Sequence, residues 1–134
     1  MNNSNTIVLR AFNKHFFEFI DDMVRIFPDN PHIKTSRDYL ETLKKANPTM
    51  LIKCWDFFIL SPYADQIEAG DLTFFFEKDY SNDVRMMPNS KEVLDVIDNT
   101  LRKPLMELEG KNKEHCLAHF QLVSKLCAKW SEGK

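Results

Sequence analysis

Two histidines near the end of the chain have a spacing that could support metal chemistry. His115 and His119 are four residues apart in a segment with helical periodicity, so both imidazoles face the same side of a helix. A zinc-protease helix needs a glutamate directly after the first histidine, but Cys116 stands there and Glu114 precedes it. Because two ligands do not make a site, we expect no metal here and interpret the pair as structural or interfacial.

Carboxylates that could serve acid–base or metal chemistry form two groups. Asp21 and Asp22, with Glu18 one turn earlier, fall on the predicted solvent side of the first helix. The acidic residues between positions 65 and 83 lack the spacing and the central glycine of an EF-hand. We therefore expect both groups to be hydrated surface.

Nucleophiles are present, but none stands in a catalytic motif. The serines include no G-x-S-x-G turn, and Cys54, Cys116 and Cys127 form no C-x-x-C pair. Their odd number fits reduced thiols in a protein core, inside a cell, better than a disulfide framework. The sequence thus predicts a non-enzymatic protein without a cofactor.

The composition favours helices as the elements that position these residues. The 134 residues are enough for one domain, and 43% of them are hydrophobic, which is enough for a core. Only three are glycine, which excludes Gly-rich phosphate loops and leaves little turn chemistry for a many-stranded β fold. We predict a single all-α domain over residues 1–134, a compact bundle of five to six helices around a central hydrophobic helix.

Asparagine–proline pairs mark where helices begin. Asn30-Pro31 and Asn47-Pro48 each place a capping side chain before a proline, which suits the first helical position. The first pair predicts an outer helix from Pro31 to Ala46. Ser61-Pro62 is expected to end the helix that the second pair starts, because proline lacks the donor that a continuing helix needs.

Three predicted helices are apolar over half or more of their circumference: Val8 to Phe27, Thr49 to Leu60, and Lys113 to Trp130. The middle one is the predicted centre of the bundle, with Trp55 buried. Between the second and third of these helices we expect a short helix over residues 71–76, a loop over 80–88 and a helix over 89–105.

The first and last helices lie near the chain ends and are harder to cover. An uncovered apolar strip with a charged rim is how association surfaces are usually built. We expect self-association or a stable protein partner through Phe17 and Val24 or through Leu122 and Leu126, with His115 and His119 at the rim. Among the sixteen aromatic residues, exposure is also expected at Phe17, Phe57 or one of Phe74 to Phe76.

Charge is uneven along the chain although the net charge is only −2, too small for general capture by nucleic acid or lipid. Residues 61–87 hold two basic and six acidic groups, and residues 111–134 hold five basic and two acidic groups. The alternative function is therefore a nucleic-acid accessory role for the last helix, through Lys111, Lys113, Lys125 and Lys129 beside Trp130. No apolar stretch reaches the ~20 residues of a membrane span, so no membrane partner is expected.

Three stretches carry a resemblance to a known family: Phe12–Asp22 ending in Ile26-Phe27-Pro28, Lys44–Pro48 leading to Ile52–Trp55, and Ile67–Asp71 continuing to Phe74–Tyr80. They resemble a family of small proteins of unknown activity encoded by large nucleocytoplasmic DNA viruses of algae and protists. The likeness covers about residues 8–85 and brings no site residues with it. It implies a viral protein of unknown activity that acts in the virus factory of the host cytoplasm or in the virion. Together with the expected association surfaces, the prediction is an interaction or scaffold protein of such a virus.

Overall fold

The computed structural model describes residues 3–71, 91, 94, 95, 98 and 102–133. Within these residues the regular structure is entirely helical and contains no strand, which confirms the predicted all-α bundle. In the same part of the chain, none of the helices combines the length and the apolar character needed to cross a bilayer.

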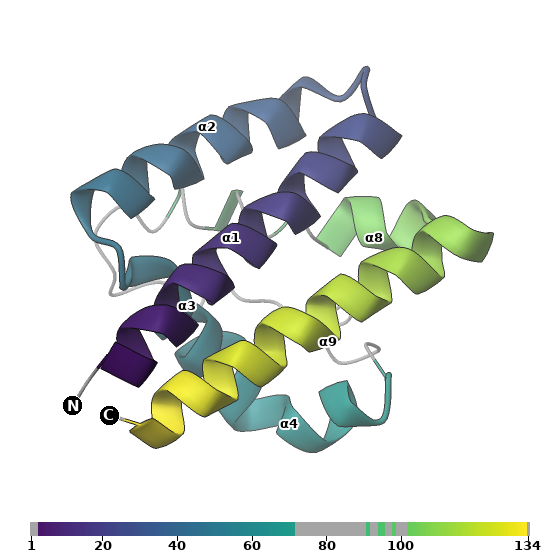
Figure 1. Cartoon of the computed structure of the whole chain (residues 1–134). Helices are drawn as coiled ribbons and strands as arrows, with labels where there is room; N and C mark the ends of the chain where they lie inside the picture. The colour runs from purple at the N-terminus through teal and green to yellow at the C-terminus, as the bar shows by residue number, and fades with distance from the viewer. Residues whose placement is uncertain (1–2, 72–90, 92–93, 96–97, 99–101, 134) are drawn as a thin grey trace.

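Two long helices form the frame of the bundle. Helix α1 (Asn3–Ile26) and helix α9 (Gly110–Gly133) run antiparallel and side by side, so the two chain ends lie together (Figure 1). The side-chain amide of Asn5 donates to the Trp130 carbonyl at 3.3 Å, which ties these ends to each other. The start of α1 therefore lies beside the end of α9, and the end of α1 lies beside the start of α9.

Helix α2 (Pro31–Ala46) has the bounds that the sequence predicts. The Asn30 side chain accepts from the His32 amide at 2.9 Å, as expected for a cap before a proline. This helix covers the side of α1 that we expected to be open. Phe17 is buried there, with Arg37 5.6 Å and Lys44 4.9 Å from its ring centre, so the expectation that Phe17 is exposed is wrong.

The central segment is longer than predicted. Helix α3 (Met50–Trp55) passes into the π-helix η1 (Asp56–Leu60) and then into α4 (Ser61–Glu68), so Ser61-Pro62 does not end it. The Ser61 amide bonds to the Asp56 carbonyl five residues earlier, and this change of hydrogen bonding accommodates the missing donor of the proline. The bend comes one residue later, at Tyr63 (φ −132°, ψ 27°). Gly70, with φ +80°, follows the segment and ends it.

Trp55 lies at the centre of the core, with 4% of its surface exposed, as predicted. Its ring centre is 4.9 Å from that of Phe120 on α9 and 6.0 Å from that of Phe16 on α1. The indole N–H donates to the Ser124 hydroxyl at 2.9 Å, so the one polar atom of the ring is satisfied inside the core. Phe57, two residues later, is 71% exposed, which confirms the expected exposure of an aromatic side chain.

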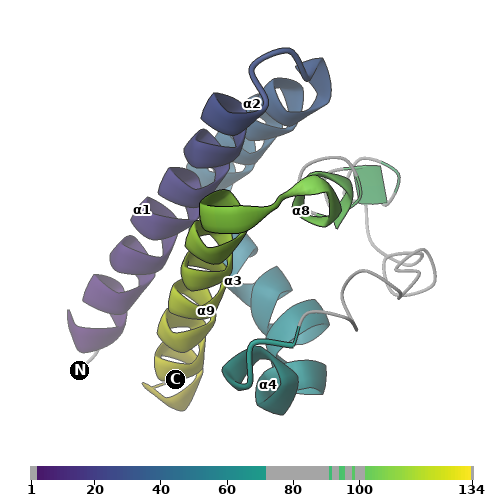
Figure 2. The ribbon, with the colours of Figure 1, turned by 90° about the vertical axis from the view of Figure 1, so that its right-hand side faces the viewer.

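The helices are ordered across the bundle as α2, α1, α9 and α4, with α3 and η1 packed behind them (Figures 1 and 2). Helix α8 (Lys103–Glu107) precedes α9 and buries Leu105. Pro104 lies at the start of α8, where a proline is tolerated because the first helical positions need no intrahelical donor. The predicted short helix over 71–76, the loop over 80–88 and Phe74 to Phe76 lie outside the described residues, as does most of the helix predicted over 89–105.

Candidate functional site

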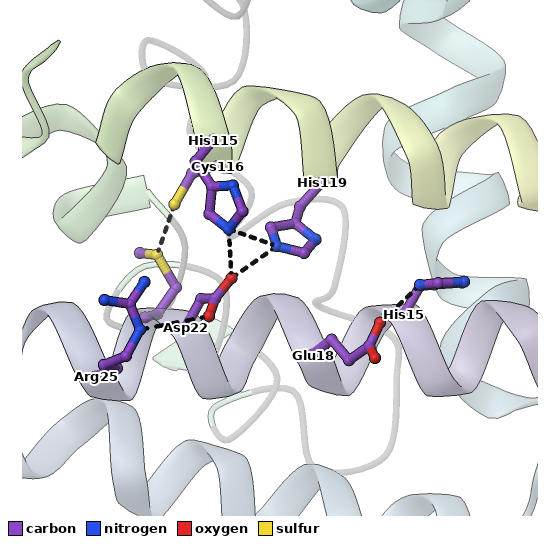
Figure 3. Close-up of polar contacts among 8 residues, drawn as sticks. His15, Glu18, Asp22, Arg25, His115, Cys116 and His119 are labelled. Carbon is purple, nitrogen blue, oxygen red and sulfur yellow. Dashed lines mark hydrogen bonds and ion pairs between the residues drawn. The ribbon is translucent and has the colours of Figure 1, made fainter. Parts of the chain in front are cut away.

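A polar cluster joins the end of α1 to the start of α9. The Oδ2 atom of Asp22 lies 2.8 Å from Nε2 of His115 and 2.7 Å from Nε2 of His119, and the two nitrogens are 3.2 Å apart (Figure 3). The antiparallel packing of the two helices produces this contact between residues 93 and 97 positions apart. We call Asp22, His115 and His119 the Asp–His cluster.

The members of the Asp–His cluster differ in exposure. The side chain of His119 is 15% exposed and that of Asp22 24%, whereas that of His115 is 52% exposed. The Phe19 ring stacks on the His119 imidazole, with centres 5.6 Å apart and an angle of 17° between the planes. The inner histidine is thus held by packing, and the outer one opens the cluster to solvent.

Electrostatics favour a charged carboxylate in the Asp–His cluster. Partial burial raises the pKa of Asp22, but hydrogen bonds and positive charge from His119 and His115 more than offset it, so the pKa lies below the usual 3.8. The other carboxylate oxygen, Oδ1, lies 3.6 Å from the Arg25 guanidinium. Each Asp22 oxygen therefore faces a different partner, and Oδ2 is left to the imidazoles.

The structure corrects the place of Asp22. We expected Asp22 on the solvent side of α1, with Asp21 and Glu18, but only Asp22 turns toward α9. Asp21 pairs with Arg37 of α2 at 2.8 Å, and Glu18 pairs with His15 on the same helix at 2.7 Å. Asp22 stands at the edge of the apolar stripe of α1, and this edge position is the signal that sequence reasoning missed.

Cys116 follows His115 directly but belongs to the core. Its sulfur lies 3.6 Å from the Met23 sulfur, and the residue is fully buried. Burial raises the pKa of the Cys116 thiol to about 11, and the Asp22 charge adds to the rise while Arg25 opposes it. The thiol is therefore protonated and points away from the imidazoles (Figure 3).

The predicted interaction residues separate into three environments. Phe17 is buried under α2, and Val24 and Leu126 are partly buried against the core. Leu122 alone of these four apolar side chains is exposed, at 37%. Leu122 also lines an open groove between α4 and α9, together with Leu60, Ala64 and Ala118.

The basic residues of α9 stand in solvent, whereas the neighbouring aromatic ring does not. Lys111, Lys113, Lys125 and Lys129 are exposed. Trp130 is 7% exposed, because its side chain packs into the hydrophobic core. The Trp130 ring is therefore not available to stack on a base, which weakens the nucleic-acid alternative.

Comparisons of the chain with protein-family models, with curated proteins and with solved structures find no match. The resemblance to the viral family therefore stays a prediction.

Proposed function

We propose that this chain is a non-enzymatic interaction protein that pairs with a second copy of itself through the groove between α4 and α9. The observation that carries the proposal is an apolar groove whose two walls bear opposite charge. Its place of action, a virus factory in host cytoplasm or a virion, follows only from the resemblance of residues 8–85 to a viral family.

The groove offers apolar surface that water would otherwise cover. Ala64 on one wall and Ala118 and Leu122 on the other are exposed, and Leu60 is partly buried. Small alanine side chains on both walls let a helix approach closely. Burial of such a strip on association is favourable, since apolar surface leaves water.

The charges on the two walls of the groove favour a second copy of this chain as the partner that binds there. The wall from α4 carries Glu68 and no basic residue, and the wall from α9 carries Lys125. A two-fold axis that runs along the groove places the acidic wall of each copy against the basic wall of the other, so Glu68 faces Lys125 of the other copy. Isologous pairing of this kind is the commonest way to form a homodimer.

The test is light scattering coupled to size exclusion across micromolar protein concentrations. The unchanged protein is expected to shift from monomer to dimer, and Leu122→Glu is expected to stay monomeric because a charge enters the apolar strip. Ile7→Glu is the matched control, since Ile7 is a 65% exposed apolar residue near the start of α1. Ile7→Glu should dimerise like the unchanged protein.

A charge exchange makes the test specific for the two-fold arrangement. Glu68→Lys and Lys125→Glu should each weaken dimerisation by roughly tenfold, because like charges then meet across the interface. The double variant restores opposite charges and should dimerise again. A monomer at all concentrations, or a double variant no better than either single one, would contradict the proposed pairing.

A further inference from the structure

We propose that Asp22, His115 and His119 bind one zinc ion that links the end of α1 to the start of α9. The three ligand atoms, Asp22 Oδ2 and the two Nε2 atoms, lie within 4.8 Å of one another (Figure 3). This goes beyond the interaction function and departs from the sequence prediction, which weighed the two histidines without Asp22.

The donor set favours zinc over the common alkaline-earth ions. Two imidazole nitrogens and one carboxylate oxygen are borderline ligands that suit Zn²⁺ and its neighbours in the first transition row. Magnesium and calcium prefer oxygen ligands throughout. Three protein ligands leave a fourth tetrahedral position, which a water molecule can fill.

The distances in the Asp–His cluster are close to those of a coordinated triangle. Ligand atoms held about 2.0 to 2.1 Å from a tetrahedral zinc ion are separated by about 3.3 Å. The two nitrogens are already 3.2 Å apart, and the oxygen–nitrogen distances are 2.8 and 2.7 Å. Zinc entry therefore requires an outward movement of a few tenths of an ångström, which the half-exposed His115 can make.

Without a cation, the hydrogen bonds among these three atoms bring two imidazole nitrogens to one carboxylate oxygen. Each imidazole nitrogen can donate one proton, and both would donate to the same Asp22 oxygen while the nitrogens stand 3.2 Å apart. Two such N–H groups bring two protons close together. A single metal ion accepts a lone pair from all three atoms and removes this conflict.

The surroundings prepare the ligands for binding. Stacking on Phe19 restrains the His119 ring, and the helical spacing holds His115 one turn away on the same face. Arg25 contacts Asp22 through Oδ1 at 3.6 Å and leaves Oδ2 directed at the imidazoles. Contacts of this kind orient metal ligands and contribute measurably to affinity.

The experiment is a titration of the full-length protein, stripped with EDTA and dialysed, with zinc chloride in a calorimeter. The unchanged protein is expected to bind one equivalent of Zn²⁺. His115→Gln and Asp22→Asn should each lose at least about 100-fold in affinity, since loss of an outer-shell partner alone costs 10- to 100-fold. Far-ultraviolet circular dichroism in EDTA confirms that each variant is folded.

Two variants control for binding elsewhere. His15→Gln removes an imidazole that contacts the Glu18 carboxylate at 2.7 Å and joins no group of three possible ligands among the described residues, so zinc affinity should be unchanged. Cys116→Ser removes the thiol next to His115 and should also leave affinity unchanged. Loss of binding in either control, or equal binding by His115→Gln and the unchanged protein, would overturn the assigned ligand set.

Thermal unfolding gives a second readout that does not depend on heat of binding. Because the ion would bind the folded chain and link residues 93 positions apart, saturating zinc should raise Tm by about 5 °C or more. The rise should be absent in His119→Gln. A titration without saturable zinc binding, together with an unchanged Tm, would refute the site.

Discussion

Two of the polar contacts that helix α9 makes with earlier parts of the chain are satisfied in different ways. Inside the core, the Trp55 indole donates to Ser124, and the Ser124 hydroxyl donates to the Phe120 carbonyl at 2.8 Å. At the surface, one Asp22 oxygen lies within hydrogen-bond distance of both the His115 and the His119 imidazole. The two imidazoles also contact each other. The first contact is neutral and complete, whereas the second gathers three ligand atoms around a position that a cation can occupy.

This difference indicates that the core contact serves stability and the surface contact serves binding. A buried donor needs one partner of fixed geometry, and Ser124 provides it, so the core contact stabilises the fold and exchanges nothing with solvent. The Asp–His cluster keeps one half-exposed side chain, His115, through which the proposed metal ion can enter from solution. Mutations should therefore affect stability at the first contact and binding at the second.

The largest expected effect is at Trp55. Trp55→Ala should lower the free energy of unfolding by about 3 to 5 kcal/mol, because it leaves a large cavity at the centre of the core. Urea unfolding followed by circular dichroism measures this change. Phe57→Ala is the control, since that ring is 71% exposed, and it should cost much less. Equal costs for the two variants would contradict the central place of Trp55.

Ser124 should come second. Ser124→Ala leaves the buried indole N–H without its partner and should cost about 1 to 3 kcal/mol. Combining it with Trp55→Phe, which removes the donor, gives a double-mutant cycle. The double variant should be more stable than the sum of the two single losses predicts, because the second change leaves no additional unpaired group. Additive losses would show that the hydrogen bond contributes nothing.

Local signals in the sequence were enough to predict most of the fold. Asn30 and Pro31 predicted the start of α2, and the Asn47-Pro48 pair predicted its end, because each signal acts within a few residues. The π-helix before Pro62 could not be anticipated from the same rules. Proline normally ends a helix, and its tolerance here depends on a local change of hydrogen bonding between Asp56 and Ser61.

The Asp–His cluster shows the limit of reasoning from a single helix. His115 and His119 were identified by their spacing, but Asp22 is 93 positions away from His115 on another helix. A helical wheel gives the side of a helix on which a residue lies, but not the neighbour that packs at the edge. For the same reason Phe17 was expected to be exposed, although α2 covers it.

A smaller effect is expected at Asp22, and it should depend on pH. The pKa of Asp22 is lowered in the folded chain, so its charge contributes stability above the usual value of 3.8 and loses that contribution as pH falls through the folded pKa. In EDTA, Asp22→Asn should cost about 1 kcal/mol at neutral pH, because the contact is partly exposed. Unfolding by urea at several pH values down to about 2.5 should show this cost disappearing in strong acid. A cost that persists there would point to a loss of packing.

The smallest perturbation uses Cys116, which stands beside the Asp–His cluster in the sequence but on the buried face of α9. A pKa of about 11 instead of 9.0 lowers the thiolate fraction near neutral pH by about a hundredfold, and burial adds a steric barrier. Iodoacetamide should therefore modify Cys116 at least a hundredfold more slowly in the native protein than in urea, as measured by peptide mass spectrometry. Because the thiol contacts Met23 and not the imidazoles, zinc should slow this labelling no more than it slows global unfolding. Fast native labelling, or protection by zinc beyond the gain in global stability, would place Cys116 with the surface contact and remove the distinction between the two faces of α9.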